Sequence, residues 1–143
     1  MIHLASHVRS VFSKAEIIAV GTELLTPFRS DTNSLFLTAR LNELGIEVCR
    51  KSIVSDESAD LASAVRDALE RTDLLIVCGG LGPTDDDRTR ETVSDVLGLA
   101  LKEDALIINS LIERFTIRGL TMPENNRRQA LVPVGAVVID NPN

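Results

Sequence analysis

The chain has 143 residues with a net charge of −6, and 44% of them are hydrophobic. This length predicts one domain with a single hydrophobic core, and the acidic balance argues against general nucleic-acid binding, which needs a basic surface. No apolar run approaches a membrane span or a secretory signal, and Cys49 and Cys78 have no metal-binding or redox spacing. We therefore expect a cytoplasmic protein with reduced cysteines.

The first half of the chain alternates apolar runs, typical of buried strands, with segments whose leucines repeat at helical spacing. Leu37, Leu41 and Leu44 share one face of the first such segment, and Gly45 ends it. A second helix is expected to begin with Ser58 as its N-cap. The predicted order is a strand over 16–20, a helix over 32–44, a strand over 47–54, a helix from 58 and a strand over 74–78.

The second half of the chain continues with helical patterns over 89–97 and 104–118, a short helix from Pro123 to Ala130 and a last strand at 137–139. Because continuous apolar strands alternate with helices, the pattern predicts a parallel sheet covered by helices on both faces. Ligands of such sheets bind beyond the carboxyl ends of the strands, where the winding direction reverses. We expect the loops after the first and third strands to face one another there.

A glycine-rich segment, Gly79-Gly80-Leu81-Gly82-Pro83-Thr84, follows the third predicted strand and precedes three acids, Asp85-Asp86-Asp87. A glycine-rich turn between a strand and a helix presents backbone N–H groups to an anion. Three adjacent carboxylates would repel a phosphate unless a divalent cation such as Mg²⁺ joined them. The segment therefore predicts a phosphorylated ligand held with a metal ion. In the plainer alternative, the glycines only form a tight turn and the acids only cap a helix.

Two other acidic segments have two roles open to them. Asp31 or Thr32 caps the helix over 32–44, or Asp31 and Asn33 point into the crevice instead. Asp56 lies among the capping signals of the next helix, but it also follows a strand at the expected ligand edge. The sequence alone leaves both roles open at each segment.

The ordered motifs carry a family resemblance. Gly21-Thr22-Glu23-Leu24-Leu25, Asp31-Thr32-Asn33, and Gly79–Thr84 followed by Asp86, Asp87 and Thr89 resemble the N-terminal domain of the competence/damage-inducible protein CinA family. The later residues Asn126, Arg128, Gln129, Ala130, Pro133 and Gly135 also resemble that family. The resemblance implies a three-layer α/β/α fold with a mostly parallel sheet, similar to the molybdopterin-binding domain of MoaB and Mog proteins. Residues 1–14 are then an N-terminal extension or a remnant of cloning, and residues 15–143 are the domain, which we expect to be truncated at its C-terminal end.

The activity that the resemblance implies is metal-dependent hydrolysis of ADP-ribose to AMP and ribose 5-phosphate, with Mg²⁺, Mn²⁺ or Co²⁺ as the cofactor. One alternative is a molybdopterin-binding or adenylyl-transferring protein of molybdenum cofactor biosynthesis. Leu81 counts against it, because those relatives more often carry Thr there. Another alternative is a non-catalytic nucleotide-binding module. The implied partners are a nucleotide or pterin phosphate and a second copy of the chain in a homodimer, with no nucleic acid and no membrane.

The resemblance also implies roles for individual residues. Asp87 and Asp56 would be the catalytic carboxylates, and Asp86 and Asp87 would hold the metal ion. The implied phosphate- or ligand-binding residues are Gly21, Thr22, Glu23, Asp31, Asn33, Gly79, Gly80, Leu81, Gly82, Thr84 and Thr89. The loop over 26–30 departs from the family pattern, because it lacks the glycine that commonly follows Gly-Thr-Glu-Leu-Leu.

Overall fold

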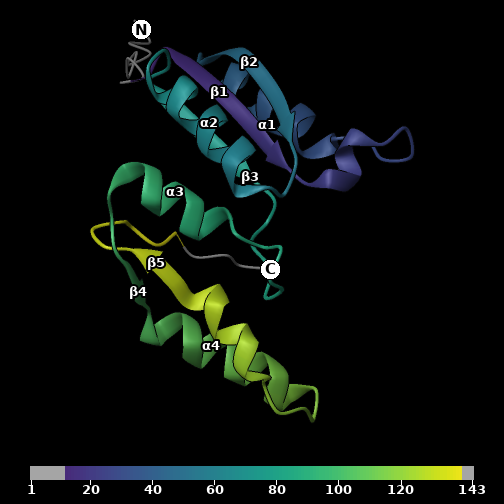
Figure 1. Ribbon diagram of the computed structural model, residues 1–143, viewed down its shortest axis with the longest axis vertical. Helices are drawn as coiled ribbons and strands as arrows, with labels where there is room; N and C mark the ends of the chain where they lie inside the picture. Colours follow the sequence, from purple (N-terminus) through teal and green to yellow (C-terminus); the bar gives the residue numbers. More distant parts are fainter. Residues whose placement is uncertain (1–11, 140–143) are drawn as a thin grey trace, which may run out of the picture.

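The computed structural model describes residues 12–139, so most of the predicted N-terminal extension and the last four residues lie outside the described residues. Two α/β lobes follow one another along the chain (Figure 1). We call residues 14–78, which form a three-stranded parallel sheet and its helices, the sheet lobe. Residues 101–133, which are built on a two-stranded antiparallel ribbon, are the ribbon lobe. The parallel sheet confirms the predicted α/β fold class.

The sheet lobe is organised around its first strand. Its strands are β1 (Lys14–Val20), β2 (Glu47–Val54) and β3 (Leu74–Cys78), in the spatial order β2-β1-β3. β1 has a partner on each side, so every residue from Ala15 to Val20 is buried. Val20 pairs with Val54, and Ala19 pairs with Cys78. This register brings the carboxyl ends of all three strands to one edge, as predicted.

Helices cover both faces of the sheet because successive β1 side chains point to opposite faces. Ile17 packs with Leu41 of α1 (Thr32–Glu43) on one face. Ile18 packs on the other face with Leu61 and Val65 of α2 (Ser58–Leu69). α3 (Thr89–Leu97) joins this second face. The N-cap of α2 is Glu57, one residue before the predicted Ser58, and Leu44 lies just beyond α1 and is exposed.

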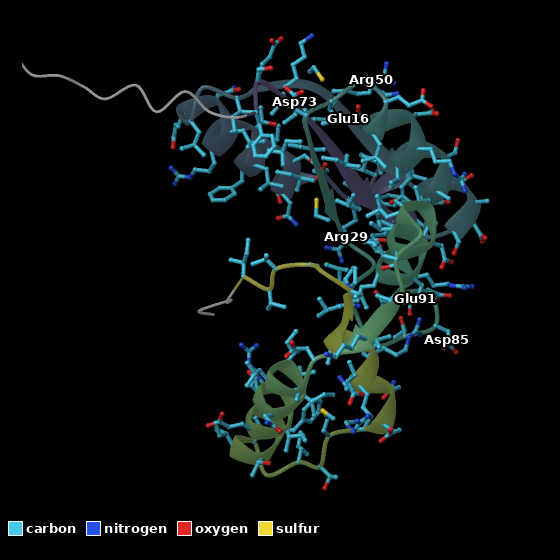
Figure 2. All side chains as sticks on the ribbon, turned by 90° about the vertical axis from the view of Figure 1, so that its left-hand side faces the viewer. Glu16, Arg29, Arg50, Asp73, Asp85 and Glu91 are labelled. Atoms are coloured by element: carbon cyan, nitrogen blue, oxygen red, sulfur yellow. The ribbon has the colours of Figure 1, made fainter. Side chains whose placement is uncertain are left out.

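One charged residue lies inside the sheet lobe. Glu16 is only 1% exposed on β1, and its two carboxylate oxygens accept hydrogen bonds from Nε and Nη2 of Arg71 at 2.9 and 2.8 Å. A buried carboxylate needs such a partner because leaving water is costly for a charge. Figure 2 shows Glu16 and Asp73 at the opposite end of the sheet from Asp85 and Glu91. The ion pair is therefore a structural feature remote from the ligand edge.

The ribbon lobe differs from its prediction. It contains β4 (Leu101–Glu103), α4 (Ala105–Ile117), η2 (Glu124–Ala130) and β5 (Leu131–Pro133). The last strand predicted at 137–139 is wrong, because β5 pairs with β4 and the chain then turns at Gly135, leaving Val137 and Ile139 87% exposed. β-branched residues favour strands only where a partner strand and a packing surface exist. The segment after Pro123 is a 3-10 helix, with Pro123 as its N-cap.

Candidate functional site

The loops after β1 and β2 are joined at the ligand edge. The Gly21 N–H donates to the Val54 carbonyl oxygen at 3.0 Å, and η1 (Thr22–Leu25) follows. The Thr22 N–H donates to Oδ2 of Asp56 at 2.8 Å, and the Asp56 N–H lies 3.3 Å from Oγ1 of Thr22. The structure therefore brings Asp56 to the predicted edge, where its carboxylate holds the backbone of the Gly21-Thr22 turn in place.

A cavity of about 160 Å³ lies between η1, the start of α1 and the end of β3. Its lining includes four of the predicted ligand residues, Glu23, Asp31, Asn33 and Gly79. The Asp31 carboxylate also caps α1, because Oδ1 accepts a hydrogen bond from the Ser34 N–H at 3.0 Å. Asp31 therefore both caps α1 and lines the cavity, so the two roles that the sequence left open for it are compatible.

Cys78 lines the same cavity. Burial, and to a smaller degree the negative charge of Asp31, raises the pKa of the Cys78 thiol. A thiol that stays protonated is a poor nucleophile, so the structure favours a packing role for Cys78 over a catalytic one.

The glycine loop leaves β3 in a conformation that side chains would obstruct. A Cβ at Gly79, whose φ is +102°, would collide with the Val20 carbonyl oxygen. A Cβ at Gly80 would collide with Oγ1 of Thr89, which donates to the Gly79 carbonyl oxygen at 2.9 Å. Thr89 is 4% exposed. Its hydroxyl therefore fastens the loop to the start of α3, which is a supporting role for this predicted ligand residue.

Asp87 folds back over the loop that precedes it. Its Oδ2 accepts hydrogen bonds from the Thr84 N–H at 3.0 Å and from the Thr84 hydroxyl. A Cβ at Gly82 would lie only 2.5 Å from the same oxygen. The Thr84 hydroxyl, together with the backbone N–H groups of Gly82 and Thr84, lowers the pKa of Asp87. An ionised carboxylate therefore occupies the Gly82 and Thr84 amides that the sequence assigned to phosphate.

The predicted metal site has few preformed ligands. Within residues 12–139, no group of three or more His, Cys, Asp or Glu side chains is arranged to hold a metal ion. Asp86 is exposed and Asp87 is half-buried. Mg²⁺ commonly binds through one or two carboxylates together with ligand phosphates and water. The donor set fits an ion shared with a phosphorylated ligand and does not fit an ion enclosed by protein.

Two arginines contact the glycine loop, although the sequence did not predict either of them as a site residue. Arg90 on α3 donates to the Leu81 carbonyl oxygen at 2.6 Å. Arg128 on η2 donates to the Thr84 carbonyl oxygen at 2.7 Å across 44 positions of the chain. No local pattern signals either contact, because each depends on how α3 and η2 pack beside the loop.

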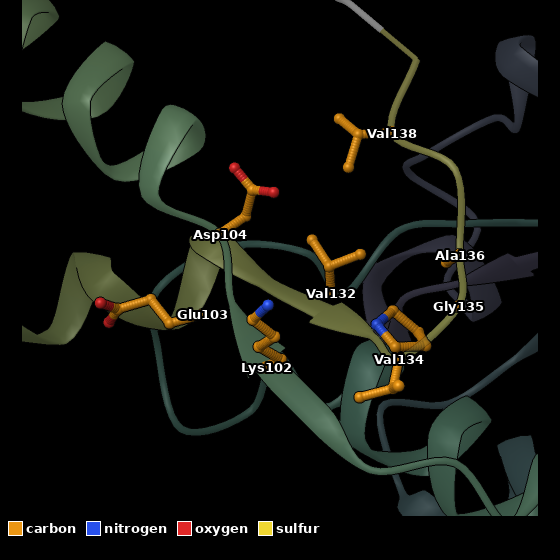
Figure 3. Close-up of a pocket in the computed structure, with 9 residues that line it drawn as sticks. Lys102, Glu103, Asp104, Val132, Val134, Gly135, Ala136 and Val138 are labelled. Atoms are coloured by element: carbon orange, nitrogen blue, oxygen red, sulfur yellow. The ribbon is translucent and has the colours of Figure 1, made fainter.

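A second cavity of about 190 Å³ lies beside the ribbon in the ribbon lobe (Figure 3). Lys102, Asp104 and Val132 line it, and Val138 approaches from the segment after β5. It contains none of the predicted ligand residues. Within the described part of the chain, no helix is both long enough and apolar enough to cross a membrane.

Comparisons with known proteins identify the domain type. A family model described as "Probable molybdopterin binding domain" matches residues 16–138. A CinA-like protein of Koribacter versatilis is 57% identical over 129 residues, which are 90% of this chain and 31% of that protein. A CinA-like protein of Acidobacterium capsulatum is 50% identical over 127 residues, with 89% and 31% covered. The chain thus spans about a third of the length of these curated relatives.

Solved structures agree with the family match. CinA from Thermoplasma acidophilum is 33% identical with a TM-score of 0.77, covering 91% of this chain and 76% of that one. The molybdopterin biosynthesis enzyme MoaB of Thermus thermophilus is 25% identical with a TM-score of 0.57, covering 85% and 74%. These similarities confirm the predicted resemblance and the three-layer α/β/α fold. The chain therefore belongs to the CinA family and carries that family's molybdopterin-binding type of domain.

Proposed function

We propose that this domain binds a phosphorylated pterin or nucleotide at the edge formed by the carboxyl ends of β1 and β3. The observation that carries the proposal is the position of Gly79, which belongs both to the glycine loop and to the lining of the polar cavity. One ligand can therefore contact both features. The description of the family model and the name of the MoaB relative support the same class of ligand.

The two features suit different parts of such a ligand. Because the Asp87 carboxylate already accepts from Thr84, a phosphate would use the backbone nearer β3, at Gly80 and Leu81. Glu23 and Asp31 in the cavity would accept hydrogen bonds from N–H groups of a heterocycle or from hydroxyl groups of a sugar. A ligand with an anion at one end and hydrogen-bond donors at the other complements this edge.

We extend the proposal to a divalent cation, Mg²⁺, Mn²⁺ or Co²⁺, held by Asp86 and Asp87 together with oxygens of the phosphate. Such a cation neutralises the charge between phosphate and carboxylates when it is bound. The position of Asp87 beside the glycine loop, where its carboxylate accepts a hydrogen bond from the Thr84 N–H, supports this role because it places anionic oxygens close to the proposed phosphate position. Without a cation, the same carboxylate would instead repel the phosphate.

A second candidate function is hydrolysis of ADP-ribose, in which water adds to phosphorus, a P–O bond of the pyrophosphate breaks, and AMP and ribose 5-phosphate leave. The Asp87 carboxylate beside the glycine loop favours it, because it could hold a cation that neutralises the charge of the pyrophosphate. The Asp56 carboxylate is engaged by Thr22, so it would support the site by shaping the turn after β1.

Calorimetric titration with pyrophosphate and with ADP-ribose, in Mg²⁺ and in EDTA, tests both functions. We expect wild-type binding in Mg²⁺ that Asp87→Asn weakens, whereas Asp95→Asn, an exposed acid on α3, leaves it unchanged. Wild-type protein that binds neither probe in either buffer would overturn the proposed ligand class. Release of AMP from ADP-ribose, absent in Asp87→Asn, would establish hydrolysis, and binding without release would leave a binding module.

The homodimer that the family resemblance implies stays a prediction. Light scattering of the purified chain would test it through the molar mass, which for one copy is 15.5 kDa.

A further inference from the structure

Arg128 connects the ribbon lobe to the glycine loop of the proposed ligand site. Its Nη1 donates to the Thr84 carbonyl oxygen at 2.7 Å, and its Nη2 lies 3.3 Å from the Asp87 carbonyl oxygen. Those carbonyls belong to the two ends of the acidic turn, which is also closed by the Asp87 N–H donating to the Thr84 carbonyl oxygen at 3.1 Å. One guanidinium therefore spans the turn from end to end.

The guanidinium is itself held in orientation from α3. Its Nη2 donates to Oε1 of Glu91 at 2.9 Å, and both side chains are about three-quarters buried, with 26% and 25% exposed. Solvent and salt screen a partly buried ion pair less than a surface pair, so Glu91 can orient the guanidinium. Figure 2 shows Glu91 and Asp85 between the sheet lobe and the ribbon lobe. Asp85 adds a longer contact of 3.4 Å to Nη1.

These contacts require the shape of an arginine. A planar guanidinium presents several N–H donors in a fixed fork, whereas a lysine ammonium is a point charge on a flexible stem. The Thr84 carbonyl oxygen accepts from Nη1, whereas the Asp87 carbonyl oxygen and the Glu91 carboxylate both accept from Nη2. Lysine would keep the positive charge near the acids, but it would not hold both carbonyls and the carboxylate at once.

We propose that Arg128 is a positioning residue through which the ribbon lobe sets the geometry of the Gly82–Asp87 turn. The inference rests on the proposed function, because its consequence is the affinity of the turn for a phosphorylated ligand. Arg128 lies beyond the cavity lining and acts through the carbonyls of Thr84 and Asp87. η2, which carries Arg128, contacts α4 and β4, so displacement of the ribbon lobe would displace the turn.

The neighbouring residue Arg127 provides a matched control. It lies on the same 3-10 helix but pairs with Glu103 and Glu124, both within the ribbon lobe. Arg127→Lys and Arg128→Lys therefore make the same chemical change one position apart, and only the second breaks contacts to the loop. Glu91→Gln is a milder second variant, because it removes the charge that orients the guanidinium.

The experiment measures amide hydrogen exchange over residues 79–88 and the affinity for pyrophosphate in Mg²⁺, using the whole chain. For Arg128→Lys we expect exchange in this segment to rise about tenfold and the dissociation constant to rise by a similar factor, as when groups that orient a binding site are removed. Exchange in β1 should stay unchanged. Glu91→Gln should shift both readouts in the same direction by less, and Arg127→Lys should shift neither.

Two results would overturn the inference while pyrophosphate still binds to the wild-type chain. In the first, Arg128→Lys and Arg127→Lys have the same exchange rates in the loop. In the second, exchange rises in Arg128→Lys without any change in pyrophosphate affinity, so that the arginine only stabilises the fold. Failure of the wild-type chain to bind both pyrophosphate and ADP-ribose would instead overturn the proposed function itself, whereas the exchange comparison between Arg128→Lys and Arg127→Lys would still test the contact with the loop.

Discussion

Gly82 is the position at which one added methyl group would test the contact between Asp87 and the glycine loop. Its Cβ would lie 2.5 Å from Oδ2 of Asp87. Gly82 is not among the glycines with positive φ, so alanine meets no backbone strain there. In Gly82→Ala the carboxylate therefore has to turn away from Thr84, while the backbone of the loop is retained.

The expected change in the free energy of unfolding is small because two effects oppose one another. Asp87 loses the hydrogen bonds from the N–H and hydroxyl groups of Thr84, and at a solvent-accessible site this costs about 1–2 kcal/mol. Replacing glycine by alanine restricts the unfolded chain and returns about 0.4–1 kcal/mol. The net loss at pH 7 should therefore be about 1 kcal/mol or less.

The pH dependence of the free energy of unfolding reports the same contact more directly, because the restriction of the unfolded chain by alanine does not depend on pH. The folded protein lowers the pKa of Asp87, first through the Thr84 hydroxyl. That contribution to stability is complete above the unfolded pKa of about 3.9 and is lost as the pH falls through the folded pKa. In Gly82→Ala the folded pKa should rise toward its ordinary value. The difference in stability between wild type and variant should then shrink as the pH falls below about 4.

Urea denaturation at pH values from about 7 to 3, with NMR titration of the Asp87 carboxyl group, measures both effects. Gly82→Ala in an Asp87→Asn background provides the control, because the carboxylate is then absent and the pH-dependent difference should vanish. An unchanged Asp87 pKa in Gly82→Ala would refute the reasoning, since it would mean that the carboxylate does not lie against Gly82.

Two further predictions concern stability away from the site. Arg71→Ala leaves the Glu16 carboxylate buried without its two hydrogen bonds, so the midpoint of urea denaturation should fall clearly, and an unchanged midpoint would contradict a stabilising role for this ion pair. Asp104→Ala removes the side chain that accepts from the Leu106 and Ile107 N–H groups at the start of α4. It should cost about 1 kcal/mol in thermal unfolding, whereas Asp104→Asn should recover most of that loss if capping is the cause.

Local sequence patterns were sufficient for the sheet lobe. β3 begins and ends as predicted at Leu74 and Cys78, because a continuous apolar run bounded by polar and glycine residues is typical of a strand, although this edge strand is only half-buried. The register of β1 with β2 and β3 then followed the rule that parallel strands end at one edge, which brought Asp56 to Thr22. The same patterns misplaced the last strand. β4 and β5 have only three residues each, too few for an alternating pattern to identify them.

The candidate site also has parts that the sequence predicted and parts that it did not. The glycine-rich turn was readable from the sequence, and the Asp31 cap was one of the roles that the sequence left open, because each depends on the backbone conformation of a few adjacent residues. The tertiary structure alone decided that Arg128 holds the carbonyls of Thr84 and Asp87, since that contact joins segments more than 40 positions apart. Such contacts depend on how lobes pack together, which composition and periodicity along one segment do not encode.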